Sequence, residues 1–144
     1  MSSKRASILS AVKTRLQGIL TTGGYATNLG QKVTDWKITS WGPDDVPGVT
    51  FRDISNKREE PGIIGKFRWN LLVEIEIIAQ APASTVRSYV ADVLKAIGAD
   101  PKWSGLAVRT DQPDVEMSFD QFEKIIGGAR ISLPIIYDAN MWED

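Results

Sequence analysis

Apolar and polar residues alternate over an unusually long stretch near the middle of the chain. Every odd position from 67 to 79 is apolar, namely Phe67, Trp69, Leu71, Val73, Ile75, Ile77 and Ala79. A period of two is typical of a β-strand with one buried face and one wetter face. Residues 67–80 would reach roughly 46 Å at about 3.3 Å each, whereas a compact chain of this length is roughly 37 Å across. One end of the strand is therefore expected to project from the body and to require a partner.

Two further segments show helical rather than alternating periodicity. Residues 4–20 carry the apolar stripe Ile8, Leu9, Val12, Leu16, Ile19 and Leu20, and the next helix carries Val86, Tyr89, Val90, Val93, Leu94 and Ile97. Pro82 and Ser84 supply start signals for the second helix, with Ser84 as the expected N-cap. Gly98 stands where a left-handed residue ends a helix. Each helix has one apolar stripe, so each can cover a single face of a sheet.

Shorter patterns predict five more strands, over residues 33–39, 49–54, 106–110, 115–119 and 129–137. The pairs Gly23-Gly24 and Gly127-Gly128 are interpreted as turns, and residues 121–126 as a short helical turn. Pro134 cannot donate a ladder hydrogen bond, which predicts an edge strand or a bulge at that point.

The order α-β-β-β-α-β-β-β predicts an α+β fold. We expect a two-layer sandwich in which a mixed or antiparallel sheet of five or six strands has two helices packed on one face. A chain of 144 residues is expected to form a single domain over residues 1–144. Within it, residues 55–66 are predicted to be a mobile hairpin loop and residues 138–144 a polar C-terminal tail.

Composition excludes much catalytic chemistry. The chain has no cysteine and no histidine, so thiol nucleophiles, thiolate metal sites, imidazole ligands and the Ser-His-Asp arrangement are all absent. Glu74 and Glu76 project from one strand face about 7 Å apart, as acids do in metal-dependent nucleases. Position 78 is Ile where that pattern has Lys, so a solvated or cross-strand-paired face is favoured.

Other candidate sites are also weak. An acidic cluster, Asp111, Asp114, Glu116 and Asp120, lacks the oxygen spacing and central glycine of a calcium loop. It is interpreted as a turn between strands, with a weak cation site as the alternative. The glycine pairs do not match phosphate-binding patterns. We therefore expect no enzyme activity, no catalytic residue, no cofactor and no metal.

Charge is balanced overall but uneven along the chain. The net charge is −1, which argues against sequence-specific binding of nucleic acid. Residues 1–72 hold 11 Lys/Arg and 6 Asp/Glu, and residues 73–144 hold 6 and 12. Either the fold mixes both halves on its surface, or one side is basic and another acidic. In the second case copies can meet head to tail, and such contacts close into rings or extend into filaments.

Neither a membrane-spanning run nor a signal peptide is predicted, so the expected site of synthesis and action is the cytoplasm, with no membrane partner. Five tryptophans are many for this length. Trp36 and Trp69 fit core positions, whereas Trp41, Trp103 and Trp142 are either folded back or available to a partner. The candidate interface residues are Asn56, Lys57, Arg58, Glu59, Glu60, Lys66, Arg68, Trp41 and Trp142.

The ordered set of these segments resembles a known family. The set runs from VTDWKI through DDVPGVTFRD, NLLVEIEI and STVRSYVADVLKAIG to FDQFEKIIGGARISLPIIYDANMWED. It is similar to the tail terminator, or tail completion, proteins of long-tailed bacteriophages, the type represented by the U protein of lambda-like phages. The resemblance covers nearly the whole chain, and its most telling part is the glycine-led last strand that closes on an aromatic residue, an acidic turn and a tryptophan.

The resemblance implies a structural role without catalysis. Six subunits would form a homo-hexameric ring that caps the tail tube, ends tail growth and presents a surface for head–tail joining. The implied partners are further copies of the chain, the tail tube protein and a head-completion or connector protein. The implied location is the host cytoplasm during assembly and then the head-proximal end of the virion tail. Alternatives are another head–tail connector, neck or tail tube protein, and a small metal-dependent nuclease that uses Glu74, Glu76 and Asp53.

Overall fold

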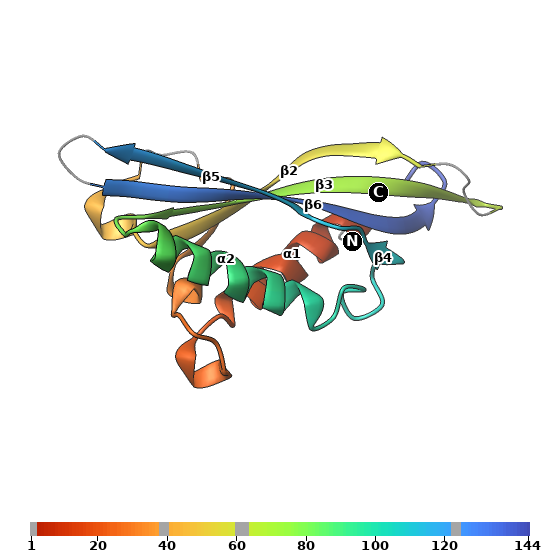
Figure 1. Cartoon of the computed structure of the whole chain (residues 1–144). Helices are drawn as coiled ribbons and strands as arrows, with labels where there is room; N and C mark the ends of the chain where they lie inside the picture. Colours follow the sequence, from red (N-terminus) through yellow and green to blue (C-terminus); the bar gives the residue numbers. More distant parts are fainter. Residues whose placement is uncertain (1–2, 38–40, 60–63, 122–124) are drawn as a thin grey trace.

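The computed structural model describes residues 3–37, 41–59, 64–121 and 125–144. A sheet forms one layer, and helices α1 (Lys4–Gln17) and α2 (Ala83–Gly98) cover one of its faces (Figure 1). The strands are β1 (Val33–Asp35), β2 (Gly48–Arg58), β3 (Lys66–Ala79), β4 (Arg109–Thr110), β5 (Asp114–Gln121) and β6 (Ile125–Asn140). Short 3-10 turns occupy Thr21–Gly23, Leu29–Gln31 and Pro43–Asp45. The predicted α+β class, the element order and the position of both helices are confirmed.

The sheet has six strands in the order β1-β2-β3-β6-β4, and β5 pairs with β6 beside β4. β1 runs parallel to β2, and the other pairs are antiparallel, so the sheet is mixed. β3 and β6 form its centre, with partners from Lys66↔Asn140 to Ala79↔Gly127. β3 is therefore one unbroken strand of 14 residues, as its alternation predicts.

The odd-numbered residues of β3 from 71 to 77 face the helix layer. Leu71, Val73, Ile75 and Ile77 are fully buried under the helices together with Ile131, Leu133 and Ile135 of β6. The stripe residues Ile8, Val12 and Leu16 of α1 and Val86, Val93 and Ile97 of α2 pack into the same core. Burying apolar side chains is the main favourable term in folding, so this layer between sheet and helices holds the domain together.

Both helices differ from the prediction at their ends. α1 begins after Ser3, whose hydroxyl accepts a hydrogen bond from the Ala6 amide, and it ends at Gln17 because Gly18 caps it. α2 begins one residue before Ser84, and Pro82 occupies the N-cap position without a side-chain hydrogen bond. The predicted Ser84 cap is therefore wrong. Gly98 is the last helical residue rather than a left-handed end, since the helix closes through a right-handed Ala99.

Several predicted loops belong to strands. Residues 55–58 extend β2 and Lys66 begins β3, so the predicted loop 55–66 is wrong at both ends; residues 60–63 lie outside the described part. Residues 138–140 of the predicted tail complete β6. The predicted helical turn 121–126 is wrong at its described ends, because Gln121 ends β5 and Ile125 begins β6; residues 122–124 lie outside the described part. Gly127-Gly128, predicted as a turn, lie within β6. In each case pairing to another strand, distant in sequence for residues 138–140 and local for the β5–β6 hairpin, supplies the ladder that local composition disfavours.

Pro134 lies in a central strand rather than at an edge. It faces Leu72 of β3, and its carbonyl accepts a hydrogen bond of 2.8 Å from the Asp111 amide on the other side. Its backbone groups therefore point away from β3, toward the gap between Thr110 of β4 and Asp114 of β5. A proline is tolerated here because its missing donor falls where no strand partner stands.

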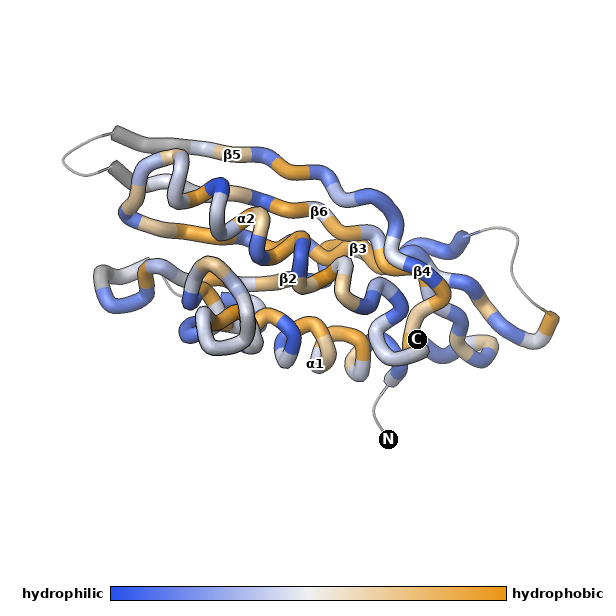
Figure 2. Tube along the Cα trace, turned by 60° about the horizontal axis from the view of Figure 1, so that its bottom comes forward, coloured by the Kyte–Doolittle hydropathy of each residue, from blue (hydrophilic) through white to orange (hydrophobic). Residues whose placement is uncertain are grey.

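The sheet is longer than the helix layer that covers it. Figure 1 shows the β2–β3 hairpin end extending beyond both helices, and Figure 2 shows apolar residues concentrated along β3 and β6 where the helices lie. Lys66 is exposed and residues 67–70 are half-buried, whereas Leu71 is fully buried. One end of the long strand therefore projects, as its length predicts.

Candidate assembly surfaces

The projecting end of the sheet, which we call the hairpin end, carries three aromatic and three basic residues. They are Phe67, Trp69 and Trp142, and Lys57, Arg58 and Lys66. The Phe67 ring meets Trp69 and Trp142 edge to face, with centroids 6.0 and 5.2 Å apart, and the Arg58 guanidinium lies 5.2 Å from its centre. Trp142 is nevertheless 86% exposed. Contiguous exposed apolar surface marks interaction sites in soluble proteins. Met141, the residue before Trp142, is 49% exposed as well, so the hairpin end is the first candidate surface.

The C-terminal residues fold back onto this end instead of forming a loose tail. The Glu143 amide donates to the Asn140 carbonyl, and the Trp69 indole N–H donates to the Glu143 carbonyl over 3.2 Å. The Asp144 carboxylate pairs with Arg5 at 2.9 Å. These contacts connect the last turn to the start of α1 and hold Trp142 beside Phe67.

The side chain of Arg68, a predicted interface residue, is paired with another residue of the same chain. Its Nε and Nη2 donate to the two carboxylate oxygens of Asp138 over 2.8 and 2.9 Å. Hydrogen bonds from Arg68 hold the pKa of Asp138 below its usual range, and the same contact raises the pKa of Arg68. Asp138 is 8% exposed. A paired, buried carboxylate of this kind positions β3 against β6 rather than binding a partner.

Glu59 is also occupied, through an ion pair with Arg109 of β4. Arg109 pairs in turn with Asp111 at 2.8 Å, and hydrogen bonds to Asp111 and Glu59 raise the pKa of the guanidinium. The Glu59 amide donates to the Arg68 carbonyl, which keeps the hairpin paired to this point. The contact between Glu59 and Arg109 joins the two margins of the sheet across its helix-free face.

Asn56 faces the core side of β2 instead of a partner. Its Nδ2 donates to the Tyr137 hydroxyl over 2.8 Å, while its Oδ1 is buried without a hydrogen-bond partner among the described residues. Tyr137 is fully buried. Burial is the main cause that raises the pKa of Tyr137 to about 12. The neutral phenol is therefore part of the folded core.

This shift predicts the alkaline stability of the protein. A folded pKa of about 12 exceeds the ordinary value, which is about 10 for tyrosine. The stabilisation is fully present below pH 10 and disappears as the pH rises through the folded value. We expect the urea midpoint to fall between pH 10 and 12 as the phenolate absorbance rises. Tyr137→Phe should weaken this alkaline decline; an unchanged decline in the variant would contradict the assignment.

The remaining predicted interface residues do not form one surface. Trp41 lies beside Gly48, at the opposite end of β2 from Arg58, and Lys37 sits 5.0 Å from its ring centre. Glu60 lies outside the described residues. The structure thus places Lys57, Arg58, Lys66 and Trp142 at the same end of the sheet, with Lys57 and Lys66 on its helix-free face and Arg58 on the face of Trp69, and it places Trp41 at the other end of β2.

Trp36 contradicts its predicted core position, whereas Trp103 takes one of its two predicted states. Trp36, predicted as core, is 46% exposed with a positive φ of 49°, and its indole N–H donates to Asp53 over 2.6 Å. β1 ends at Asp35, so the alternation that pointed Trp36 inward does not continue through it. Trp103 is 1% exposed and is therefore folded back.

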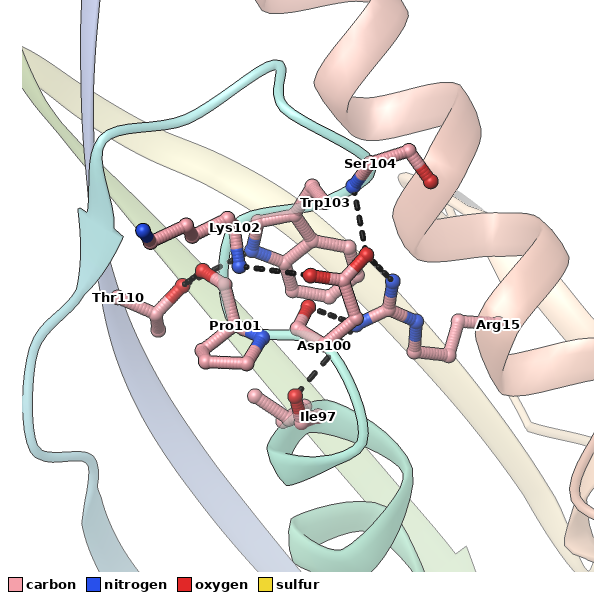
Figure 3. A network of polar contacts seen from close by, with 8 residues as sticks. All are labelled: Arg15, Ile97, Asp100, Pro101, Lys102, Trp103, Ser104 and Thr110. Carbon is pink, nitrogen blue, oxygen red and sulfur yellow. Dashed lines mark hydrogen bonds and ion pairs between the residues drawn. The ribbon is translucent and has the colours of Figure 1, made fainter.

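Trp103 belongs to a brace between α1 and the loop after α2 (Figure 3). The Arg15 guanidinium stacks 4.1 Å from the ring centre and pairs with the Asp100 carboxylate at 3.6 Å. The Trp103 indole N–H donates to Thr110 over 2.9 Å. Amide donation from Ser104 is the largest cause that lowers the pKa of Asp100. The Arg15 guanidinium, the Asp100 carboxylate and the Trp103 indole N–H are all engaged within this brace, so the brace is structural.

The carboxylate pair of β3 is part of a cross-strand network. Arg52 of β2 lies 3.4 Å from Glu74 and 3.6 Å from Glu76, and Arg130 of β6 lies 3.2 and 3.7 Å from the same residues. The paired-face interpretation of Glu74 and Glu76 is therefore confirmed. In the described ranges no cluster of three or more His, Cys, Asp or Glu residues has metal-binding geometry.

Comparison with known proteins addresses the fold. A chain from a gene transfer agent virion has the same fold. That structure is described as the virion of a native gene transfer agent particle; the two chains align with a TM-score of 0.50 and 15% identity over 90% of this chain and 93% of the other. No family model matches the sequence, and neither does any curated protein. At this identity the likeness establishes a shared fold.

Among the helices of the described residues, none is long and apolar enough to cross a bilayer.

Sequence reasoning missed Asp138 and Tyr137 because both lie in the segment assigned to the last strand and tail, where neither charge nor aromaticity alone indicates a partner. The signal available was the facing register: Arg68 and Asp138, and Trp69 and Tyr137, become opposite once β3 and β6 are paired.

Proposed function

We propose that this chain is a structural protein of a phage-like virion, and that it acts as a tail terminator. Six copies form a closed ring that caps the tail tube, stops its growth and offers a surface for head–tail joining. The protein has no catalytic role, and its partners are its own copies, the tail tube protein and a head-completion protein. It would assemble in the host cytoplasm and reside at the head-proximal end of the tail.

The projecting hairpin end is the observation that carries this proposal. β3 continues past the helix layer at this end (Figure 1), where Phe67 packs edge to face against Trp69 and Trp142 and the Trp69 indole N–H donates to the Glu143 carbonyl. Met141 and Trp142 are 49% and 86% exposed on the same end. An exposed apolar surface of this kind is stabilised when a neighbour covers it, and a ring supplies such a neighbour to every subunit.

Two further observations support the proposal. The resemblance of the whole ordered sequence points to tail terminators, and the fold is shared with a chain of a gene transfer agent virion. The charges of Glu74 and Glu76 are neutralised by Arg52 and Arg130. A nuclease would need these carboxylates for metal ions, so the nuclease alternative receives no support.

Assembly measurements test the proposal. Multi-angle light scattering, with and without polymerised tail tube protein, is expected to detect a species of six times the 15.9 kDa subunit mass. Negative-stain microscopy is expected to show closed rings, and rings at the ends of tubes. Trp142→Ala should weaken ring formation while leaving the melting temperature nearly unchanged.

The alternatives give different images. Open cylinders of this protein alone would favour a tail tube subunit, and rings that ignore tubes but bind head-completion protein would favour a connector. A monomer at every concentration, indifferent to tubes, would overturn the proposal.

A further inference from the structure

The sheet has two open edges, one on each side, among the described residues. On one side β1 pairs with Val49–Phe51 of β2, and no other described strand pairs with residues 54–58 along this edge. On the other side β5 is outermost, and within the described part of the chain its one partner is β6. Figure 2 shows β5 and β2 on opposite sides of β6 and β3. Exposed edges are templates for pairing with another strand.

The hydrogen-bond pattern identifies which β5 groups face outward. The Asp111 amide bonds to the Pro134 carbonyl, which places the backbone groups of alternate β6 residues on the β5 side. Glu116, opposite Arg130, therefore bonds to β6. The intervening Val115 and Met117 turn their amides and carbonyls to the open edge. Their side chains are 40% and 38% exposed on the helix side of the sheet.

The same reasoning applies to the open part of β2. The Glu59 amide bonds to the Arg68 carbonyl, so Lys57 and Ser55 bond to β3 by alternation, and Asn56 between them faces outward. A β-bulge between Asp53 and Ser55 leaves Ile54 47% exposed at this edge. The open segment therefore offers outward backbone groups and an apolar side chain, as β5 does.

Charge distinguishes the two edges. On the helix-free face β5 carries exposed Asp114 and Glu116, whereas the open segment of β2 carries exposed Lys57. Both edges also show exposed apolar groups, Val115 and Met117 on one and Ile54 at the bulge of the other. An acidic edge and a basic edge are complementary to each other and unfavourable to themselves. The natural occupant of each edge is therefore the other edge on a second copy.

We propose that a second copy of this chain docks its β5 edge against residues 54–58 of β2, so that the sheet continues from subunit to subunit. β5 runs opposite to β2, because each successive pair between them is antiparallel. A copy placed beside the first in the same orientation thus forms an antiparallel joint.

The two open segments are offset along β3, near Trp69–Leu72 for β2 and from Glu74 onward for β5. Closed sheets require such a stagger together with strand tilt. The contact is heterologous, since the two copies use different surfaces, and a contact of this type closes into a ring when its rotation allows. The inference rests on the proposed ring and names the surfaces that hold it together.

Disulfide trapping tests the joint, because the chain has no cysteine of its own. Lys57→Cys is combined with Asp114→Cys, Glu116→Cys or Ser118→Cys, which sample possible registers on the helix-free face. Facing residues on adjacent strands lie about 4.5–5.5 Å apart, within disulfide range. Mild oxidation should give a ladder of covalent multimers in at least one pair. Equal mixtures of the single-cysteine variants should stop at dimers.

A matched control pair places one cysteine away from the joint. Lys13→Cys on the exposed side of α1, combined with Glu116→Cys, should give no ladder.

Charge reversal adds an independent readout. Lys57→Glu should raise the concentration needed for half-assembly by about tenfold, the equivalent of about 1.4 kcal/mol, and adding Glu116→Lys should restore assembly. Circular dichroism checks that each variant is folded.

The outcomes separate this inference from the proposed function. Rings in the unmodified protein, with no ladder above the control pair in any register and no rescue by charge exchange, would overturn the joint and leave the terminator proposal standing. No rings with or without tail tubes would overturn both. A ladder with charge rescue supports the joint.

Discussion

Ile75→Asp is expected to abolish folding at neutral pH. Ile75 is fully buried at the centre of the sheet, between Phe51 of β2 and Ile131 of β6. Loss of a buried isoleucine costs about 2–5 kcal/mol when the side chain is truncated, and an unpaired buried carboxylate adds several kcal/mol more. The sum is of the same order as the free energy of unfolding of a typical domain, which is about 5–15 kcal/mol.

Circular dichroism and urea unfolding measure this effect. The matched control is Ile75→Val, expected to fold with a loss of about 0.5–1.5 kcal/mol. Trp69→Asp supplies a contrast on the same strand face. Trp69 is half-buried at the hairpin end, so this variant is expected to fold and to lose assembly chiefly. A cooperative, nearly normal transition for Ile75→Asp, or an unfolded Trp69→Asp, would show that the projecting end is misplaced.

Arg68→Met is expected to lower the free energy of unfolding by about 3–5 kcal/mol, because it leaves the buried Asp138 carboxylate without its main partner. The Lys4 Nζ contacts the Asp138 carbonyl rather than this carboxylate, so it does not replace the guanidinium. Replacing both partners by apolar residues, Arg68→Met with Asp138→Leu, should recover much of the loss. Urea unfolding of the two single variants and the double variant measures the coupling.

The pH dependence of this pair has a defined sign. Arg68 lowers the pKa of Asp138 in the folded protein, so the stabilisation is present above the unfolded value of about 3.9 and is lost as the pH falls through the folded value. In Arg68→Met the pH dependence of stability should have the opposite sign, since protonation of Asp138 removes the buried charge. The variant should lose less stability than the unmodified protein between pH 7 and 4. An equal or greater loss would mean that Asp138 is well solvated.

The sequence determined the elements whose pattern repeats over many residues. The alternation of β3 and the stripes of both helices depend on which side chains are apolar, and each pattern is read within one segment. The same evidence predicted the α+β class, the unbroken long strand and the paired character of Glu74 and Glu76. For these features local patterning and tertiary packing agree, as expected when one face of each element must be buried.

Only the tertiary structure decided where strands end and which charges remain for a partner. Residues 55–58 and 138–140 look like loop and tail, yet they are strands because distant partners complete their hydrogen bonds. Arg68 and Glu59 look available, yet Asp138 and Arg109 occupy them. Their availability depends on register, a relation between residues 50 or more positions apart. Periodicity within one segment carries no information about that relation, since register is set where separate strands meet.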